Sequence, residues 1–334
     1  MAYGFTYTLP AISGSHTDFP VLLKADDFPS AAIDGTTNAL NNGGGNLVAY
    51  TSDAKSTQLA VHVVSFVSSG SPLAEVWIKI GTANVGETIY IEADAVQTSQ
   101  PASTATYGIE AVWSGAEVAV LMEDATPVDH TGNHTLGLSG TLTDISGPFG
   151  RANSFSGNDR LSNSDASLKD ILTTYNTTVS VISRKSTYEN DEAVLSFEGT
   201  DDAVLYPLDS IGGNGQRVFW RDIGGSIIDV DSESLAGTWV YSSFTTRASN
   251  NHELYTNGSS VGTSSDTGTA GPFTAFYVGG FGSSSQDWDG DIAQVIVWKT
   301  ARTSNWTATE EDNQSASSAW GTVGTWTDAG GGST

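Results

Sequence analysis

Residues 288–298 read Trp288-Asp289-Gly290-Asp291-Ile292-Ala293-Gln294-Val295-Ile296-Val297-Trp298. From residue 292 onward the side chains alternate between the two sides of an extended chain, and apolar residues occur on both sides. One face carries Ile292, Gln294, Ile296 and Trp298, and the other carries Ala293, Val295 and Val297. A strand that is apolar on both faces needs protein packed against each of them. The stretch therefore predicts a central strand of a β-sandwich.

Further strand patterns extend over the second half of the chain. They occupy residues 117–122, 178–183, 193–198, 216–220, 227–230, 239–245, 252–256 and 275–279. Between two of them stands Asn257-Gly258, a strong signal for a two-residue hairpin because both turn positions need a positive φ. The number of strands is enough for two packed sheets.

The first third of the chain has its own strand series, at residues 19–23, 47–51, 58–66, 74–80 and 88–93. Within residues 75–80, Val76, Ile78 and Ile80 are predicted to point one way, and Glu75, Trp77 and Lys79 the other. Such alternation, with Gly/Pro/Ser turns between strands, predicts an antiparallel β-sandwich whose sheets have one buried face.

Helix signals are few, and the best cover residues 164–172 and 304–311. At roughly 100–200 residues per domain, the length of 334 residues suggests two domains. The polar stretch 98–104 is interpreted as the connection between them. We predict an N-terminal domain over residues 1–110 and a second domain over residues 111–334, in contact with each other.

Composition excludes several classes of function. The chain has no cysteine, and its 38 acidic side chains against 13 basic ones give a formal net charge of −25. The absence of cysteine excludes disulfide scaffolds, thiolate metal sites and cysteine nucleophiles. Phosphate backbones and anionic lipids are bound through Lys and Arg, so we expect no nucleic-acid partner and no role at a membrane surface.

The first ten residues alternate aromatic and polar side chains like a strand, without the basic start and apolar run of a signal peptide. No stretch approaches the roughly 20 apolar residues that span a bilayer. We therefore expect neither a cleaved signal peptide nor membrane insertion.

Three groups of residues in the second half form a family pattern. Residues 147–159 are similar to "GxFGxAxxFxGxxD", residues 237–241 and 253–258 look like "GxWxxV…LYxNG", and residues 276–280 and 288–298 fit "xIGG…FxGxIxxVxIW". In this order and spacing they resemble the laminin-G-like, concanavalin-like jelly-roll family, which includes pentraxins and bacterial and phage carbohydrate-binding modules. The expected fold is all-β: an N-terminal β-sandwich, then a concanavalin-like (laminin-G-like) jelly roll, with few short helices.

The first hundred residues resemble more loosely the small β-sandwich that precedes such a jelly roll in bacterial and phage surface proteins. The similarity lies in residues 18–24, 74–80, 88–91 and 111–113. The resemblance implies no activity for this domain, and we interpret it as an adaptor for attachment.

Carbohydrate binding needs aromatic faces for sugar C–H surfaces, with Asp, Asn and Gln nearby to bond hydroxyls. Trp239 and Trp298 lie in strands of the family pattern and are expected in the core. Trp220 and Trp288 border Gly/Ser/Asp loops, where core and surface positions both stay open. The predicted carbohydrate-binding residues are Trp220, Trp288, Tyr206, Asp201, Asp202 and Asn214.

Two alternatives are open for cofactors, namely none or a calcium ion. Pentraxin-like relatives place an acidic cluster just after the "xGG" strand and an Asp/Asn pair on an earlier loop. Asn190 and Asp191 match the earlier pair, but the later position keeps only Gln286 and Asp287. Calcium collects about six to eight oxygen ligands. We therefore expect no cofactor, and calcium at Asn190, Asp191 and Asp287 is left as a hypothesis.

Catalysis is the competing class, because concanavalin-like folds include glycoside hydrolases with carboxylates on one strand. The nearest match is the stretch Asp229-Val230-Asp231-Ser232-Glu233. In a regular strand Asp229 and Glu233 would lie about 13 Å apart. Retaining and inverting glycosidases need roughly 5–5.5 Å and 6.5–9.5 Å between the two carboxyl groups. We expect no enzymatic activity.

The stretch Asp129-His130-Thr131-Gly132-Asn133-His134 offers two imidazoles and a carboxylate. No second cluster completes the set of at least three protein ligands that a metal site requires. The resemblance places an opening loop of the jelly roll here, and we expect a polar loop.

The domain pair resembles phage structural proteins, and a lectin without a signal peptide can leave the cell by lysis. We therefore predict a bacteriophage virion protein, made in the host cytoplasm, as a head decoration, baseplate or tail-fibre component. Its predicted partners are capsid or tail subunits and host cell-surface polysaccharide, in many copies or as a homo-oligomer. The alternatives are an extracellular or cell-surface bacterial lectin or adhesin, a structural cement protein without glycan binding, and a glycoside hydrolase.

Overall fold

The computed structural model describes residues 2–36, 38–41, 43–185, 192–199, 203–209, 215–220, 227–230, 237–265, 272–282 and 287–328, with the backbone alone at 203–209, 215–220 and 227–230. Contacts divide the chain into unit 1, made of Met1–Ser114 and Asp312–Thr334, and unit 2, made of Gly115–Glu311. Both units are built from β-sheets with a few short helices, which confirms the predicted all-β class.

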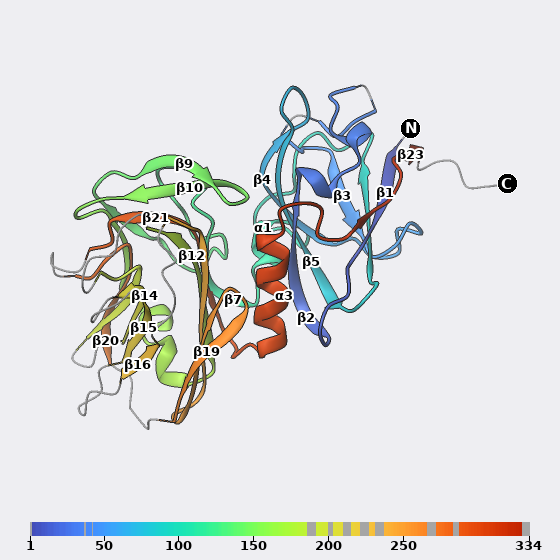
Figure 1. Cartoon of the computed structure of the whole chain (residues 1–334). Coiled ribbons are helices and arrows are strands. Elements are labelled where there is room, and N and C mark those ends of the chain that lie inside the picture. Colours follow the sequence, from blue (N-terminus) through green and yellow to red (C-terminus); the bar gives the residue numbers. More distant parts are fainter. Residues whose placement is uncertain are drawn as a thin grey trace. The chain divides into compact units, whose positions relative to one another are not determined.

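Unit 1 has two antiparallel sheets (Figure 1). Sheet A has the strand order β22-β1-β6-β3, with β23 also paired to β1, and sheet B has the order β2-β5-β4. The strands are β1 (Tyr3–Thr8), β2 (His16–Lys24), β3 (Leu47–Tyr50), β4 (Ala60–Val67), β5 (Leu73–Ala83), β6 (Thr88–Ala93), β22 (Thr322–Val323) and β23 (Thr327–Asp328). The helices of this unit are η1 (Ala25–Asp27), η2 (Ser30–Ala32) and α1 (Ile109–Val112).

Strand β5 is buried on both faces around Trp77, which corrects the prediction that only the Val76 side is buried. The reason is the segment that follows α1. Trp113 lies edge-on to Trp77 with ring centroids 5.1 Å apart. Its indole N–H donates to Nδ1 of His62 on β4 over 3.0 Å. A period of two cannot reveal such a cover, because the covering residue is distant in sequence.

Residues 98–114 belong to unit 1, whereas the sequence indicated a connection at 98–104 and a boundary at 110. The side chain of Gln100 donates to the carbonyl of Gly44 over 2.6 Å and to that of Leu47 over 2.9 Å. These bonds attach the segment to the loop before β3.

The C-terminal segment also belongs to unit 1, although the sequence analysis placed it in the second domain. Strands β22 and β23 pair with β1, next to which β23 is seen in Figure 1. The side chain of Asn313 accepts from the backbone N–H of Leu22 over 2.8 Å and donates to its carbonyl over 2.9 Å. The paired strands cover one edge of sheet A, and Asn313 satisfies backbone groups at the edge of β2 in sheet B.

Unit 2 has two antiparallel sheets, of eight and seven strands in the part of the chain that the structure describes. Sheet C has the order β19-β18-β17-β12-β21-β10-β9, with β7 also paired to β21. Sheet D has the order β16-β15-β14-β13-β20-β11-β8. The strands of sheet C are β7 (Ala116–Val120), β9 (Thr143–Gly147), β10 (Gly150–Phe155), β12 (Thr177–Arg184), β17 (Val240–Ala248), β18 (Asn251–Thr256), β19 (Ser259–Ser264) and β21 (Gly290–Trp298). Those of sheet D are β8 (Gly137–Ser139), β11 (Arg160–Asn163), β13 (Leu195–Gly199), β14 (Ala203–Asp209), β15 (Gly215–Trp220), β16 (Ile227–Val230) and β20 (Phe273–Val278).

The core of unit 2 lies between these sheets. It joins Val181 and Val295 of sheet C to Leu195 and Phe276 of sheet D. Strand β21 pairs with β12, β10 and β7, as predicted for a central strand. Its other face carries Trp298, which is buried as expected and lies 5.7 Å, between ring centroids, from Trp306 of helix α3 (Ser304–Ser315).

The local signals also appear where they were predicted. Asn257 and Gly258 have φ values of 46° and 72°, and they connect β18 to β19.

The helix predicted at 164–172 is instead two short pieces, α2 (Ala166–Lys169) and η3 (Ile171–Thr174). The break lies at Asp170, whose carboxylate accepts from the backbone N–H of Phe273 over 3.0 Å.

In the part of the chain that the structure describes, no helix has the length and apolar character needed to cross a membrane.

Candidate functional site

Trp288, one of the predicted sugar-stacking residues, is fully buried. Its backbone N–H donates to the carbonyl of Gly279 over 3.1 Å, and the Nζ atom of Lys185 lies 5.3 Å from the centroid of its ring. Gly290 permits this position, because a Cβ atom there would lie 2.9 Å from the indole. The prediction that Trp288 stacks on a sugar at the surface is therefore wrong.

The other predicted carbohydrate-binding residues lie in or beside sheet D. Tyr206 is in β14 and Trp220 is in β15, and the register pairs Tyr206 with Arg217 and Ala203 with Trp220. Asp201, Asp202 and Asn214 are outside the described residues. Their assignment stays a prediction.

Most residues of the calcium and catalytic hypotheses lie outside the described residues. Asp287 lies 3.6 Å from Nη1 of Arg160, and burial raises its pKa. Asn190 and Asp191, its predicted partners, are outside the described residues, as are Asp231 and Glu233. Asp229 is in β16. Within the described ranges, no three His, Asp or Glu side chains are placed to hold a metal ion.

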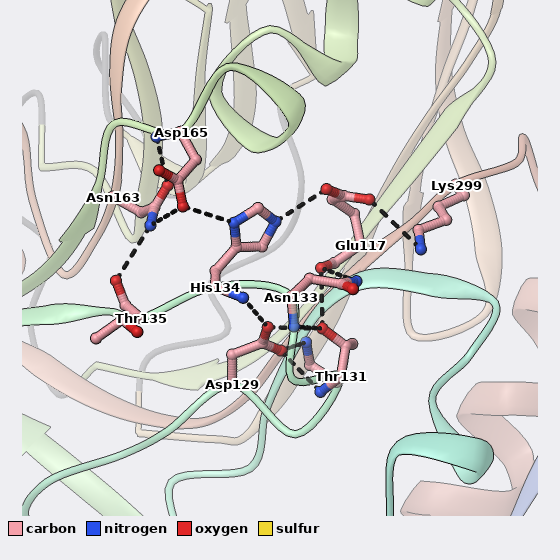
Figure 2. A network of polar contacts seen from close by, with 10 residues as sticks. Glu117, Asp129, Thr131, Asn133, His134, Thr135, Asn163, Asp165 and Lys299 are labelled. Carbon is pink, nitrogen blue, oxygen red and sulfur yellow. Dashed lines mark hydrogen bonds and ion pairs between the residues drawn. The ribbon is translucent and has the colours of Figure 1, made fainter. Parts of the chain in front are cut away.

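The loop from Asp129 to His134 is a closed polar network (Figure 2). The carboxylate of Asp129 accepts from the backbone N–H groups of Ala119, Thr131 and His134 and from the hydroxyl of Thr131, over 2.6–3.0 Å. The side chain of Asn133 donates to the carbonyl of Glu117 over 3.1 Å. A carboxylate that already accepts four hydrogen bonds has little capacity left for a metal ion.

His134 joins this loop to two elements of unit 2, as Figure 2 shows. Its Nε2 lies 2.9 Å from Oε1 of Glu117 in β7, and its Nδ1 lies 3.0 Å from Oδ2 of Asp165, directly before α2. Nζ of Lys299 lies 3.5 Å from Oε2 of Glu117, and the side chain of Asn163 donates to Asp165 over 3.0 Å. The hydrogen bond from His134 lowers the pKa of Asp165.

The geometry of His134 gives this network a structural role. Ionised carboxylates only accept hydrogen bonds, so both ring nitrogens donate together only when the ring is an imidazolium. Glu117 lies at Nε2 of His134 and Asp165 lies at Nδ1. A metal ion bound to one ring nitrogen therefore cannot also bind the carboxylate at the other. The expectation of a polar loop agrees with this arrangement, while the ties to Glu117 and Asp165 were not predicted.

A second buried polar group lies where α3 covers sheet C. Glu310 is buried and accepts from the hydroxyls of Tyr241 and Ser180. Burial raises the pKa of Glu310 to about 7, against the opposing effects of these bonds and of Arg302. Its position in the packed interior suits a structural role.

A partly exposed tryptophan lies beside an ion pair at one end of sheet C, and we call Trp239, Arg184 and Asp291 the Trp239 platform. Trp239 directly precedes β17, Arg184 ends β12, and Asp291 is the second residue of β21. These three strands are neighbours, and the register pairs Arg184 with Asp291 and Ser183 with Val240. The three side chains are therefore brought together by the order of the strands.

Within the Trp239 platform, the guanidinium carbon of Arg184 lies 4.6 Å from the centroid of the Trp239 ring. The Nε and Nη2 atoms of Arg184 both donate to Oδ2 of Asp291, over 2.9 and 2.6 Å. The ring of Trp239 is partly exposed, and 34% of the Arg184 side chain is accessible to solvent. The arrangement offers an aromatic surface next to a hydrogen-bonding ion pair.

Sequence reasoning placed Trp239 in the core and did not select Arg184 or Asp291. The signal that was present is the position of Trp239, which follows the exposed Gly237 and Thr238 and directly precedes strand β17. Arg184 and Asp291 lie 107 residues apart. Only the register of β12 against β21 places them side by side.

Comparison with known proteins identifies the fold of unit 2. Residues 155–308 match the family described as the concanavalin A-like lectin/glucanases superfamily. No curated protein matches the chain.

Among solved structures, the receptor binding domain of the botulinum neurotoxin C/D mosaic serotype is similar with a TM-score of 0.50 and 14% identity, over 60% of this chain and 52% of that one. The binding domain of Paraclostridial Mosquitocidal Protein 1 has a TM-score of 0.49 and 14% identity, over 60% of this chain and 52% of that one. Domain 4 of an extracellular arabinanase from Geobacillus stearothermophilus, solved in complex with arabinotriose, has a TM-score of 0.49 and 15% identity, over 58% of this chain and 96% of that one. This chain thus spans about half the length of the neurotoxin and mosquitocidal-protein domains. At 14% identity, the likeness to the neurotoxin domain is one of fold.

Proposed function

We propose that the domain containing residues 155–308, a member of the concanavalin A-like lectin/glucanases superfamily, binds carbohydrate at the Trp239 platform. The observation that carries the proposal is the partly exposed Trp239 ring beside the ion pair of Arg184 and Asp291. A sugar presents C–H groups on the faces of its ring and hydroxyls around its rim. An indole surface and a pair of charged hydrogen-bonding groups complement these two parts.

Binding at one such site is expected to be weak, because a single shallow platform buries little of a sugar. Many copies on one support raise the apparent affinity through effective concentration. The test is therefore retention of the full-length chain, coupled in many copies to beads, on a panel of polysaccharides. Trp239→Ala should weaken retention about fivefold or more, since truncating a stacked aromatic removes about 1–3 kcal/mol of apolar contact.

Tyr277 provides the matched control. It is a partly exposed aromatic of unit 2 with Arg160 over its ring at 5.7 Å, but it belongs to sheet D. Tyr277→Ala should retain binding. Loss of binding in Tyr277→Ala, with full binding in Trp239→Ala, would move the site to sheet D, where Tyr206 and Trp220 were predicted to act.

We further propose that the domain binds glycans without cleaving them. The support is the spacing of Asp229 and Glu233, which would be about 13 Å in a regular strand and unsuitable for paired carboxylates. Incubation of the chain with β-glucans, alginates and agars should release no reducing ends. Turnover that disappears in Asp229→Asn and in Glu233→Gln would instead identify a glycoside hydrolase.

We also propose that the chain is a component of a bacteriophage particle, in the head decoration, baseplate or tail fibre. It rests on the resemblance of the two-domain arrangement to phage structural proteins, and the expected partners are capsid or tail subunits and host cell-surface polysaccharide. Mass spectrometry of purified particles tests it. Absence of the chain from particles, together with its presence on a bacterial surface, would favour the lectin or adhesin alternative.

A further inference from the structure

We infer, on the basis of the proposed function, that the Trp239 platform selects uncharged glycans and excludes those that carry carboxylate or sulfate groups. The charges around the Trp239 ring determine this selectivity, whichever neutral sugar is bound.

Among the described residues, Arg184 and Lys185 are cationic side chains at this end of sheet C, and both are paired with carboxylates. Arg184 directs two N–H groups to Asp291, and Nζ of Lys185 forms an ion pair with Glu192. Only 4% of the Lys185 side chain is accessible. An anionic sugar at Arg184 would lie next to the carboxylate of Asp291, whose negative charge repels it, since strong anion recognition relies on cationic groups whose charge is not already paired.

The surroundings add negative charge to this neutral arrangement. Asp289 is exposed, and its backbone N–H donates to the carboxylate of Glu192 over 3.4 Å. The whole chain carries a formal net charge of −25, which repels polyanions at a distance. Both the local charges and the long-range field therefore disfavour a charged glycan.

A neutral sugar can form hydrogen bonds with Arg184 and Asp291 without breaking their ion pair. Arg184 keeps N–H groups beyond the two that Asp291 accepts, because a guanidinium has five. Both of these bonds end on Oδ2 of Asp291, and no described residue donates to Oδ1. A pair of neighbouring hydroxyls can therefore accept from Arg184 and donate to Asp291, while the C–H groups of the ring contact Trp239.

The experiment measures retention of the bead-coupled chain on dextran, arabinan, galactan, mannan and β-glucan, against dextran sulfate, polygalacturonate and alginate. It is run in 1 M NaCl, where the Debye length is about 3 Å and the distant charges of the chain are screened. We expect at least one neutral glycan to be retained about tenfold or more better than every anionic one.

Two substitutions separate the effect of the Arg184–Asp291 ion pair on selectivity from the effect of net charge. Asp291→Asn removes the negative charge that is paired with Arg184, although its amide oxygen can still accept a hydrogen bond, and should increase retention on anionic glycans. Asp289→Asn changes the net charge equally but leaves the partner of Arg184 charged, and should leave the selectivity as it is. Equal effects of the two variants would overturn the inference.

The outcomes also distinguish this inference from the proposed function. Preference of the unmodified chain for an anionic glycan, lost in Trp239→Ala, would overturn the selectivity and leave carbohydrate binding in place. Retention on no glycan of either class would overturn both.

Discussion

Trp288 and Trp239 both belong to unit 2, yet one is fully buried and the other partly exposed. Both stand one or two residues before a strand of sheet C. Trp288 is accommodated because Gly290 leaves space for its indole, whereas Trp239 lies against the partly exposed guanidinium of Arg184. The side chains of neighbouring residues thus decide which tryptophan is available to a ligand.

Trp288→Ala should destabilise unit 2 by about 3–5 kcal/mol, because truncating a buried tryptophan leaves a cavity. Trp239→Ala should change the free energy of unfolding by less than about 1 kcal/mol, as is usual for partly exposed sites. Urea unfolding followed by fluorescence measures both. A stable Trp288→Ala variant that has lost only glycan retention would restore Trp288 as a binding residue.

Glu310 makes the stability of unit 2 depend on pH. Burial raises its pKa from 4.5 to about 7, so the folded state holds a proton that the unfolded state has already released between these values. The resulting stabilisation is complete below about pH 4.5 and is lost as the pH rises through about 7.

The difference in unfolding midpoint between the unmodified chain and Glu310→Gln isolates this effect. We expect Glu310→Gln to gain stability relative to the unmodified chain as the pH is raised from 5 to 8, because glutamine has no proton to lose. Parallel midpoints over this range would contradict the assignment.

At the scale of elements, His134 connects strand β7 to helix α2 through Glu117 and Asp165. The bond from His134 lowers the pKa of Asp165, so the carboxylate stabilises the fold above its unfolded-state pKa of about 3.9. This contribution is lost as the pH falls through the lower, folded-state value.

Asp165→Asn should therefore lower the thermal midpoint at pH 7 and have little effect near pH 3. Hydrogen exchange should also increase at the start of α2, while the strands of sheet D keep their protection. Asp144→Asn is the control, since Asp144 is an exposed acid of β9 in the same unit. Equal changes of the thermal midpoint at both pH values, or equal changes in both variants, would show that Asp165 has no ionic role.

At the scale of the whole molecule, unit 2 is inserted between two segments of unit 1. The returning segment supplies β22 and β23 to the edge of β1, and the backbone N–H of Trp320 donates to the buried carboxylate of Asp27 over 2.9 Å. Unpaired strand edges are open to aggregation. Unit 1 therefore depends on residues that follow unit 2 in the sequence.

A chain that ends at Ser315 keeps helix α3 but loses both short strands. We expect faster hydrogen exchange and a lower unfolding midpoint in β1 and β6, and unchanged exchange in β12 and β21 of unit 2. A chain that ends at Asp328 keeps both strands and is the control. Unchanged exchange in β1 of the shorter chain would show that the C-terminal segment is dispensable.

Several features follow from the sequence by itself, because they depend on neighbouring residues. The period of two in residues 292–298 identifies a strand that is covered on both faces, and Asn257-Gly258 specifies a hairpin through two positive φ values. The start of α3 at Ser304 likewise agrees with the local pattern.

Other features were decided only by the tertiary structure. The return of residues 312–328 to unit 1, the tie from His134 to Asp165 across 31 positions, and the pairing of Arg184 with Asp291 across 107 all join distant segments. Alternation along a strand says which side chains share a face, but it does not say what packs against that face. Strand order and register supply this information, and they make Trp239 a surface residue and Trp288 a core residue.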